Sequence, residues 1–427
     1  MASIAVSFGK DPREQAPVHV ATGAWTIDKL ACWLLVVAVV FINAADFRGD
    51  TGEEFRVHWQ IYLRLLVAFI CGCVGILYFI PKTFRDFLAG PGLFVSGYVA
   101  WYGATLVTSV DRSYCTAAWI SLVGVLLIIP AAMRVLGGAN YLSAVASGLT
   151  LYLIGSWIAY LFVPAVGVFQ EQVTQTLVYE RMGGLGHPNE LGFYAAFTVL
   201  VYAGLATSGR LRWSIASCGM ALGAATLLTC FSRTAMIACG FGLLFTLQMH
   251  LRQRGNAVAV FLALSLLTLV AFIAMGTGKL DWFVESALTK LTKSGSTEEL
   301  STATGRTEIW AYGIEQIKAS PIVGYGYCSA RFVMEEYSFH CHNIVLNALL
   351  FGGILSGGIV LGMILYLMRS LVVAPRPEID GLVVCMLVGG MVDGLLGAPS
   401  PAATVLIWFS ILLWRQLDMH LAPPASV

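Results

Sequence analysis

The sequence predicts an all-α protein that crosses a membrane about twelve times and carries one long outer loop with short helices. Of its 427 residues, 58% are hydrophobic and only 11% are charged, and the mean hydropathy is +0.79. Water-soluble domains carry about 25% charged residues. The composition therefore excludes an ordinary soluble enzyme, a disordered chain and a small secreted disulfide module. The net charge of +1 offers no electrostatic basis for binding nucleic acid.

Twelve apolar runs predict the spanning helices, because a bilayer core of about 30 Å needs roughly 20 apolar residues per helix. The runs are continuous rather than alternating, which favours helices over barrel strands. The third run contains Gly90, Pro91 and Gly92 near its start, and the last run is short. In order, the predicted spans are Leu30–Ala45, Ile61–Ile80, Phe87–Val107, Tyr114–Leu136, Leu142–Val163, Glu190–Thr207, Trp213–Cys230, Thr234–His250, Ala257–Met275, Asn343–Leu367, Ile379–Leu396 and Thr404–Trp414.

Basic residues in the short loops predict that both termini are cytoplasmic. With the N-terminus inside, thirteen Lys and Arg residues lie in cytoplasmic segments and six lie in short outer segments. The long loop after Met275 is set aside, because long loops follow this rule poorly. The chain then divides into residues 1–275 with nine spans, residues 276–341 as the outer loop, and residues 342–427 with three spans and a short tail.

The outer loop is expected to contain short helices, and a loop of this length is more often functional than idle. Apolar residues between Trp282 and Leu291 repeat at helical spacing and predict an amphipathic helix at the membrane surface. A second helix is predicted to begin near Arg306 and to end at Pro321. Cys328 and Cys341 also lie in this loop, and the sequence leaves open whether they form a disulfide.

Ionisable residues gather at the outer ends of the predicted spans. Each has a plain structural explanation: a terminal arginine often reaches lipid phosphates, and Asn343 next to His342 can cap a helix. Arg233 lies in a very tight turn and opposes the positive-inside preference. Asp393 in an apolar run needs a partner. The topology places the whole group on one side: Arg181, His187, Glu190, Arg233, Arg306, His340, His342 and Asp393.

These residue types suit group transfer from a lipid-linked pyrophosphate to a hydroxyl. Arginine binds phosphate through a planar fork of donors and keeps its charge. Histidine can accept the proton of an attacking hydroxyl. His340-Cys341-His342 is a weak metal signal, because zinc needs three or four ligands and no further ligand is spaced for it. The sequence thus predicts neither a metal nor a cofactor.

Five motifs in the second half of the chain resemble the bacterial O-antigen ligase and polymerase superfamily. They occur in the family's order, with the long loop between the ninth and tenth spans, whereas the first five spans carry no signature. The motifs are Gly186-His187-Pro188-Asn189-Glu190-Leu191-Gly192, Ser232-Arg233-Thr234-Ala235, Gly305-Arg306 with Trp310, Pro321 with Gly324 and Gly326, and His342-Asn343 with Gly352-Gly353.

The resemblance implies an inverting, metal-independent glycosyltransferase that takes a glycan from undecaprenyl diphosphate, at the periplasmic side of the bacterial inner membrane. It implies that Arg233 and Arg306 bind the diphosphate, with Arg181 as a weaker third, and that His342 is the general base. His187 and Asn189 would shape the site, and Asp393 would orient a partner. The additional histidine, His340, leaves the choice of base partly open.

The acceptor distinguishes several activities within this superfamily. A ligase uses a sugar hydroxyl of lipid A–core oligosaccharide, a polymerase uses another lipid-linked glycan, and related enzymes use Ser or Thr of proteins. The single dominant outer loop favours a ligase. A membrane transporter is the alternative from another class, but transporters often show repeated halves and polar residues at mid-membrane. Here the spans show no obvious repeat, and the charges gather at one rim.

Overall fold

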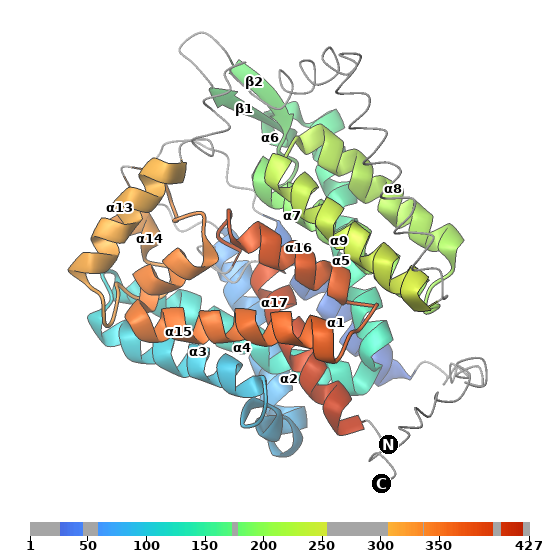
Figure 1. Cartoon of the computed structure of the whole chain (residues 1–427), viewed down its shortest axis with the longest axis horizontal. Coiled ribbons are helices and arrows are strands. Elements are labelled where there is room, and N and C mark those ends of the chain that lie inside the picture. The colour runs from blue at the N-terminus through green and yellow to red at the C-terminus, as the bar shows by residue number, and fades with distance from the viewer. Residues whose placement is uncertain are drawn as a thin grey trace, which may run out of the picture.

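The computed structural model describes residues 26–45, 59–172, 178–253, 306–335, 337–395 and 403–421 (Figure 1). It is an all-α, multi-pass membrane protein, as predicted. Among these residues, eight helices are long and apolar enough to cross a bilayer: α1 (Ile27–Ala44), α2 (Trp59–Phe87), α4 (Arg112–Leu136), α5 (Gly138–Phe162), α7 (Pro188–Thr207), α8 (Trp213–Cys230), α9 (Arg233–Gln253) and α15 (Ile344–Val373). Two further helices, α16 (Asp380–Gly390) and α17 (Ala403–Leu421), contain shorter apolar stretches.

The third predicted span differs most from the structure. Helix α2 continues to Phe87, and α3 (Gly92–Thr105) has only 14 residues before a 3-10 turn over Leu106–Thr108. A Cβ atom on Gly92 would lie 1.7 Å from the carbonyl oxygen of Asp86, so the turn between the two helices needs glycine at that position. The expected span from Phe87 to Val107 is therefore shortened by the turn at its start.

Other predicted segments differ at their ends or lie outside the described residues. Helix α16 ends at Gly390, so Asp393 lies in the turn after the helix and not inside a span. Helix α13 (Arg306–Ala319) begins and ends where the sequence predicts, two residues before Pro321. The ninth predicted span, Ala257–Met275, and the amphipathic helix predicted from Trp282 to Leu291 both fall outside the described residues.

The helices form two groups with α16 and α17 between them (Figure 1). Helices α7, α8 and α9 pack together on one side, and α3, α13 and the short α14 (Ala330–Val333) lie with α15 on the other. Helix α16 contacts α7 and α9 as well as α15. This arrangement brings the start of α15 and the end of α16 toward the starts of α7 and α9, although these segments are far apart in sequence.

A two-stranded antiparallel sheet was not predicted from the sequence. The short helix α6 (Pro164–Gly167) leads into β1 (Val168–Gln172), which pairs with β2 (Val178–Met182). Neighbouring side chains of a strand point to opposite faces. Glu180 is accordingly exposed, whereas Arg181 is only 4% exposed. The hairpin therefore directs Arg181 inward, toward the segment that leads into α7.

Helix α15 is broken at Gly352 and Gly353, and Gly353 has a φ of +62°. The chain segment from Pro321 to Gly326 packs into the break. The backbone N–H of Gly326 donates to the Phe351 carbonyl at 2.8 Å, and that of Ile354 donates to the Pro321 carbonyl at 2.9 Å. The two glycine-containing motifs thus meet, and their hydrogen bonds replace those that the helix loses.

Candidate active site

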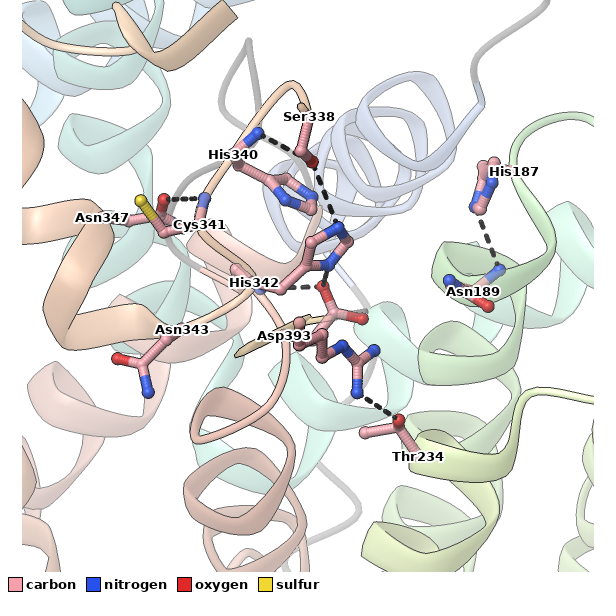
Figure 2. A network of polar contacts seen from close by, with 12 residues as sticks. His187, Asn189, Thr234, Ser338, His340, Cys341, His342, Asn343, Asn347 and Asp393 are labelled. Atoms are coloured by element: carbon pink, nitrogen blue, oxygen red, sulfur yellow. Dashed lines mark hydrogen bonds and ion pairs between the residues drawn. The ribbon is translucent and has the colours of Figure 1, made fainter. Parts of the chain in front are cut away.

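The loop before α15 and the turn after α16 bring His340, His342 and Asp393 together (Figure 2). Nδ1 of His342 lies 3.6 Å from Oδ1 of Asp393, and Nε2 of His342 lies 3.3 Å from Oγ of Ser338. The rings of His340 and His342 are nearly perpendicular, with centroids 4.0 Å apart. The imidazole of His342 is thus held between a carboxylate and a hydroxyl group.

Asn343 fixes the position of His342 by capping α15, as the sequence suggested. Its Oδ1 accepts the backbone N–H groups of Val345 and Leu346 at 2.9 and 3.0 Å, and its Nδ2 donates to the Met391 carbonyl at 2.9 Å. The cap therefore ties the start of α15 to the turn that carries Asp393. His342 itself has a φ of +47°, an uncommon left-handed conformation that the surrounding contacts must maintain.

Cys341 lies between the two histidines and is part of this fixed loop. Its backbone N–H donates to Oδ1 of Asn347 at 2.8 Å, and its side chain is buried against Gly313 and Met334. Neither Cys341 nor Cys328 forms a disulfide with another described residue. The disulfide that the sequence left open is therefore absent between these two described residues.

Arg306 and Arg233 are the first residues of α13 and α9. Nη1 of Arg306 donates to Oγ1 of Thr234 at 3.3 Å, which links the two helix starts. Burial lowers the pKa of Arg306, while the charge of Asp393 raises it and that of Arg233 lowers it, and burial dominates. A helix N-terminus carries partial positive charge. Arg233 at the start of α9, with Arg306 near enough for their charges to interact, therefore forms a cationic region.

Arg181 was expected to contact the diphosphate, but its guanidinium is enclosed by protein acceptors. Nη1 donates to Glu171 at 2.9 Å, Nη2 donates to Oδ1 of Asn189 at 3.0 Å, and Nε donates to the Cys230 carbonyl at 2.9 Å. Nη2 also approaches the carbonyl of Phe231 at 3.3 Å. The structure therefore favours a positioning role for Arg181, which joins the hairpin to the starts of α7 and α9.

His187 and Asn189 form the start of α7. Nδ1 of His187 accepts the backbone N–H of Asn189 at 3.3 Å, and the His187 ring packs edge-on against Phe169 of β1, with centroids 4.9 Å apart. Asn189 also accepts the bond from Arg181. The two residues thus connect the hairpin, α7 and the wall of the site.

A cavity of about 1130 Å³ joins His187 and Asn189 to the histidine–aspartate cluster. The α6–β1 segment supplies an apolar wall that includes Val168 and Phe169. Arg233 and Arg306 are not among the described residues that line the cavity. Arg306 is nevertheless close enough to Asp393 for their charges to interact. The remaining polar lining includes Glu190, Arg331, Ser338, His340, His342 and Asp393.

Two of these lining residues carried no role in the sequence-based prediction. Ser338 contacts His342. The only feature of the sequence that could have indicated this contact is that Ser338 lies four residues before His342. Arg331 was counted only as a basic residue of the outer loop. Its guanidinium lies 5.2 Å from the centre of the Tyr114 ring, and Nη1 approaches the Tyr114 hydroxyl at 3.4 Å. Arg331 therefore adds a cation to the cavity wall.

The electrostatic environment shifts the pKa values of Asp393 and His340, so that one is charged and the other is neutral at neutral pH. Burial raises the pKa of Asp393, but its interaction with His342 and the nearby charges of His340 and Arg306 outweigh burial and lower that pKa to about 2. Burial, together with the neighbouring His342, lowers the pKa of His340 to about 4. At neutral pH, Asp393 is therefore a carboxylate and His340 is uncharged.

The fold also supplies a third possible metal ligand that the sequence did not reveal. One ligand atom from each of His340, His342 and Asp393 lies within 4.8 Å of the other two. The sequence-based argument against a metal rested on the lack of a further suitably spaced ligand. Asp393 comes from a distant segment, so no local spacing could have identified it.

Comparisons with known proteins agree with the motifs. A family profile described as O-antigen ligase matches residues 218–361, a segment that contains Arg233, Arg306 and His342. The exopolysaccharide production protein ExoQ of Rhizobium meliloti (strain 1021) is 32% identical over 208 residues. That match covers 44% of this chain and 45% of the relative, so the chain matches less than half of the length of that protein.

Proposed function

Because the chain belongs to the O-antigen ligase and polymerase superfamily, we propose that it transfers a glycan from undecaprenyl diphosphate to a sugar hydroxyl. In this proposal the enzyme lies in the bacterial inner membrane with both termini in the cytoplasm, and the cavity faces the periplasm. The observation that carries the proposal is the convergence of Arg306, Asp393 and His342 beside a large cavity.

His342 is the general base in this reaction. With Nδ1–H directed at Asp393, Nε2 carries the lone pair and faces Ser338 at the cavity wall. Nε2 takes the proton from the acceptor hydroxyl while that oxygen attacks the anomeric carbon of the donor sugar. Asp393 holds the ring in the required tautomer and stabilises the imidazolium that forms. A separation of 3.6 Å can shorten when substrate binds, as catalytic contacts often do.

The anomeric carbon–oxygen bond breaks in the same step, and undecaprenyl diphosphate leaves as an anion. In this proposal Arg233 and Arg306 stabilise this charge, because guanidinium groups bind phosphate oxygens in pairs. One displacement at the anomeric carbon inverts its configuration. The residues therefore account for proton removal and for leaving-group stabilisation without a covalent enzyme intermediate.

We favour lipid A–core oligosaccharide as the acceptor, because the matched family profile is described as O-antigen ligase and the sequence predicts one dominant outer loop. A polymerase is the second candidate, since the similar protein from Rhizobium meliloti is described as an exopolysaccharide production protein. In that case the acceptor is the end of another lipid-linked glycan. Both candidates use the same base and the same diphosphate site.

The test uses purified full-length protein, undecaprenyl-diphosphate-linked glycan and lipid A–core, with products separated by mass. Glycan on lipid A–core supports the ligase, and longer lipid-linked chains support the polymerase. If neither product forms while the lipid-linked glycan crosses a sealed vesicle membrane, the chain is a transporter and the proposal is wrong.

His342→Gln is the informative variant, because glutamine retains a polar side chain but cannot act as a base. We expect transfer to fall by about 10²–10⁴-fold, the usual contribution of a general base. His340→Gln is the matched variant on the same loop. If His340→Gln loses transfer and His342→Gln keeps the wild-type rate, then His340 is the base.

A further inference from the structure

We propose that His340, His342 and Asp393 bind a divalent ion of the zinc class, and that this ion inhibits glycan transfer by withdrawing His342 from its role as base. Imidazole nitrogen and carboxylate oxygen are ligands that zinc and its first-row neighbours accept. The inhibitory part of this proposal depends on the proposed function, whereas binding of the ion does not.

The geometry comes close to that of a three-ligand site. Zinc bonds of about 2.0 Å in a tetrahedral site place neighbouring ligand atoms roughly 3.3 Å apart. Nδ1 of His342 and Oδ1 of Asp393 are already 3.6 Å apart. All three ligand atoms lie within 4.8 Å of one another. The fourth position would face the cavity and hold water.

Unsatisfied nitrogen atoms give a second and independent reason for this site. Nδ1 of His340 is buried and has no hydrogen-bond partner among the described residues, and Nδ1 of His342 is buried with only the 3.6 Å contact to Asp393. A buried polar atom without a partner is costly. A bound cation would satisfy such atoms. The backbone N–H of Gly394 donates to Oδ1 of Asp393 at 2.7 Å, and such outer contacts orient the carboxylate ligands of metals.

Metal binding and catalysis require opposite tautomers of His342. For catalysis, Nδ1 carries the proton toward Asp393 and Nε2 accepts a proton from substrate. For metal binding, the lone pair of Nδ1 faces the ion, and Nε2–H donates to Oγ of Ser338. The ion therefore converts the nitrogen that should accept a proton into a donor. The charge of Arg306 near Asp393 opposes a dication, so we expect weaker binding than at a structural zinc site.

The test uses full-length protein in detergent, first treated with a chelator and then dialysed. Zn²⁺ binding is measured by calorimetry, and Co²⁺ provides a visible spectrum that reports on ligand geometry. We expect one ion per chain and a cobalt spectrum typical of four-coordinate nitrogen and oxygen ligands. His340→Gln should weaken Zn²⁺ binding by at least about tenfold, since even the loss of an outer-shell partner can cost that much.

His187→Gln is the control, because His187 lines the same cavity but is not part of the cluster. It should bind Zn²⁺ as the wild type does. In the transfer assay, the rate of each variant in Zn²⁺ is divided by the metal-free rate of the same variant. The Zn²⁺ concentration that halves this ratio should be at least tenfold higher in His340→Gln than in the wild type.

Equal Zn²⁺ affinity in wild type and His340→Gln would overturn the proposed site, and stimulation of transfer by Zn²⁺ would overturn the inhibition. Absence of any transfer in metal-free wild type would instead refute the proposed function. The cobalt spectrum and calorimetry would then still decide whether the ion binds.

Discussion

Three arginines near the candidate site use their guanidinium groups in different ways. Arg181 is 4% exposed and donates to Glu171, Asn189 and the end of α8. Arg233 and Arg306 begin helices and lie close enough to influence one another electrostatically. The same residue type therefore serves internal structure at one position, and we propose that it binds an anion at the two others.

Substitution should separate these two roles. Arg181→Ala leaves Glu171, Asn189 and a backbone carbonyl without their donor, and loss of a buried ionic partner costs about 3 kcal/mol. We expect a clear fall in the thermal unfolding midpoint in detergent. Arg233→Ala should instead weaken binding of the lipid-linked donor and leave that midpoint near the wild-type value.

The matched comparison is Arg233→Lys, which keeps the charge but loses the planar fork and should restore donor binding only in part. The assignments would be reversed if Arg181→Ala kept its thermal midpoint and lost only donor affinity.

His340 should make stability depend on pH. Its pKa in the folded protein is about 4, below the value of 6.5 for an unperturbed histidine. The unfolded chain therefore takes up a proton between these two values that the folded chain does not. The contribution of His340 to the free energy of unfolding is fully present above about pH 6.5 and is lost as the pH falls toward 4. The thermal midpoint should drop from pH 7 to pH 5, and His340→Gln should reduce that drop.

Measurements of both proteins at pH 8 provide the reference, because His340 is then neutral in the folded and unfolded states and any difference reflects packing alone. An identical pH dependence in wild type and His340→Gln would contradict the prediction.

At the scale of elements, the broken helix α15 determines where His342 lies. The segment Ile344–Phe351 carries the asparagine cap, and the rest of α15 continues in a separate helical segment after Gly353. The turn containing Gly324 packs so closely on this break that a Cβ atom on Gly324 would lie 2.6 Å from the backbone of Gly352. Glycines in both motifs are therefore needed for one backbone-to-backbone contact.

Gly353→Ala should be strongly destabilising. The residue has a left-handed φ of +62°, and the added Cβ would lie 2.1 Å from the carbonyl oxygen of Ile322. The left-handed conformation alone costs roughly 1–2 kcal/mol for a residue with a side chain. We expect a lower thermal midpoint and reduced transfer, because the start of α15 would shift.

Gly358→Ala in the same helix is the control, since a Cβ atom there meets no described atom within 4 Å. It should unfold at or slightly above the wild-type temperature. Similar effects of the two substitutions would show that the break in α15 does not depend on Gly353.

For the molecule as a whole, the outer surface matches a lipid environment. Large apolar side chains are exposed on α2 and α8, for example Phe69 at 68% and Leu228 at 65%. The polar groups of the candidate site face inward, toward other helices and the cavity and away from this apolar surface. The cavity lies near the starts of α7 and α15, and the hairpin also lines it.

The proposed orientation can be tested at the two ends of α7. Glu180 precedes this helix beside the cavity, and Arg210 follows it in an exposed turn. We expect a membrane-impermeant maleimide, added to intact cells, to label Glu180→Cys but not Arg210→Cys.

Labelling of both variants after the membrane is opened controls for accessibility, and the wild-type protein controls for its native cysteines. Labelling of Arg210→Cys alone in intact cells would place the cavity in the cytoplasm.

Most spanning helices were predictable because each depends on a local apolar run of sufficient length. The helix at Arg306, its end before Pro321 and the cap at Asn343 were also local features, and the structure confirms them. The hairpin was missed because β1 and β2 have only five residues each and depend on pairing with one another. The third span was overestimated because a glycine turn interrupts an otherwise apolar segment.

The sequence by itself determined that this protein is a multi-pass membrane protein, and its motifs resemble those of the O-antigen ligase and polymerase superfamily. These conclusions depend on composition and on residues that are close in the chain. Only the tertiary structure decided that Asp393 meets His342, that Arg181 is enclosed by internal acceptors, and that Ser338 and Arg331 line the cavity. Such contacts join segments that are distant in sequence, and helix packing determines their distances, which no local pattern encodes.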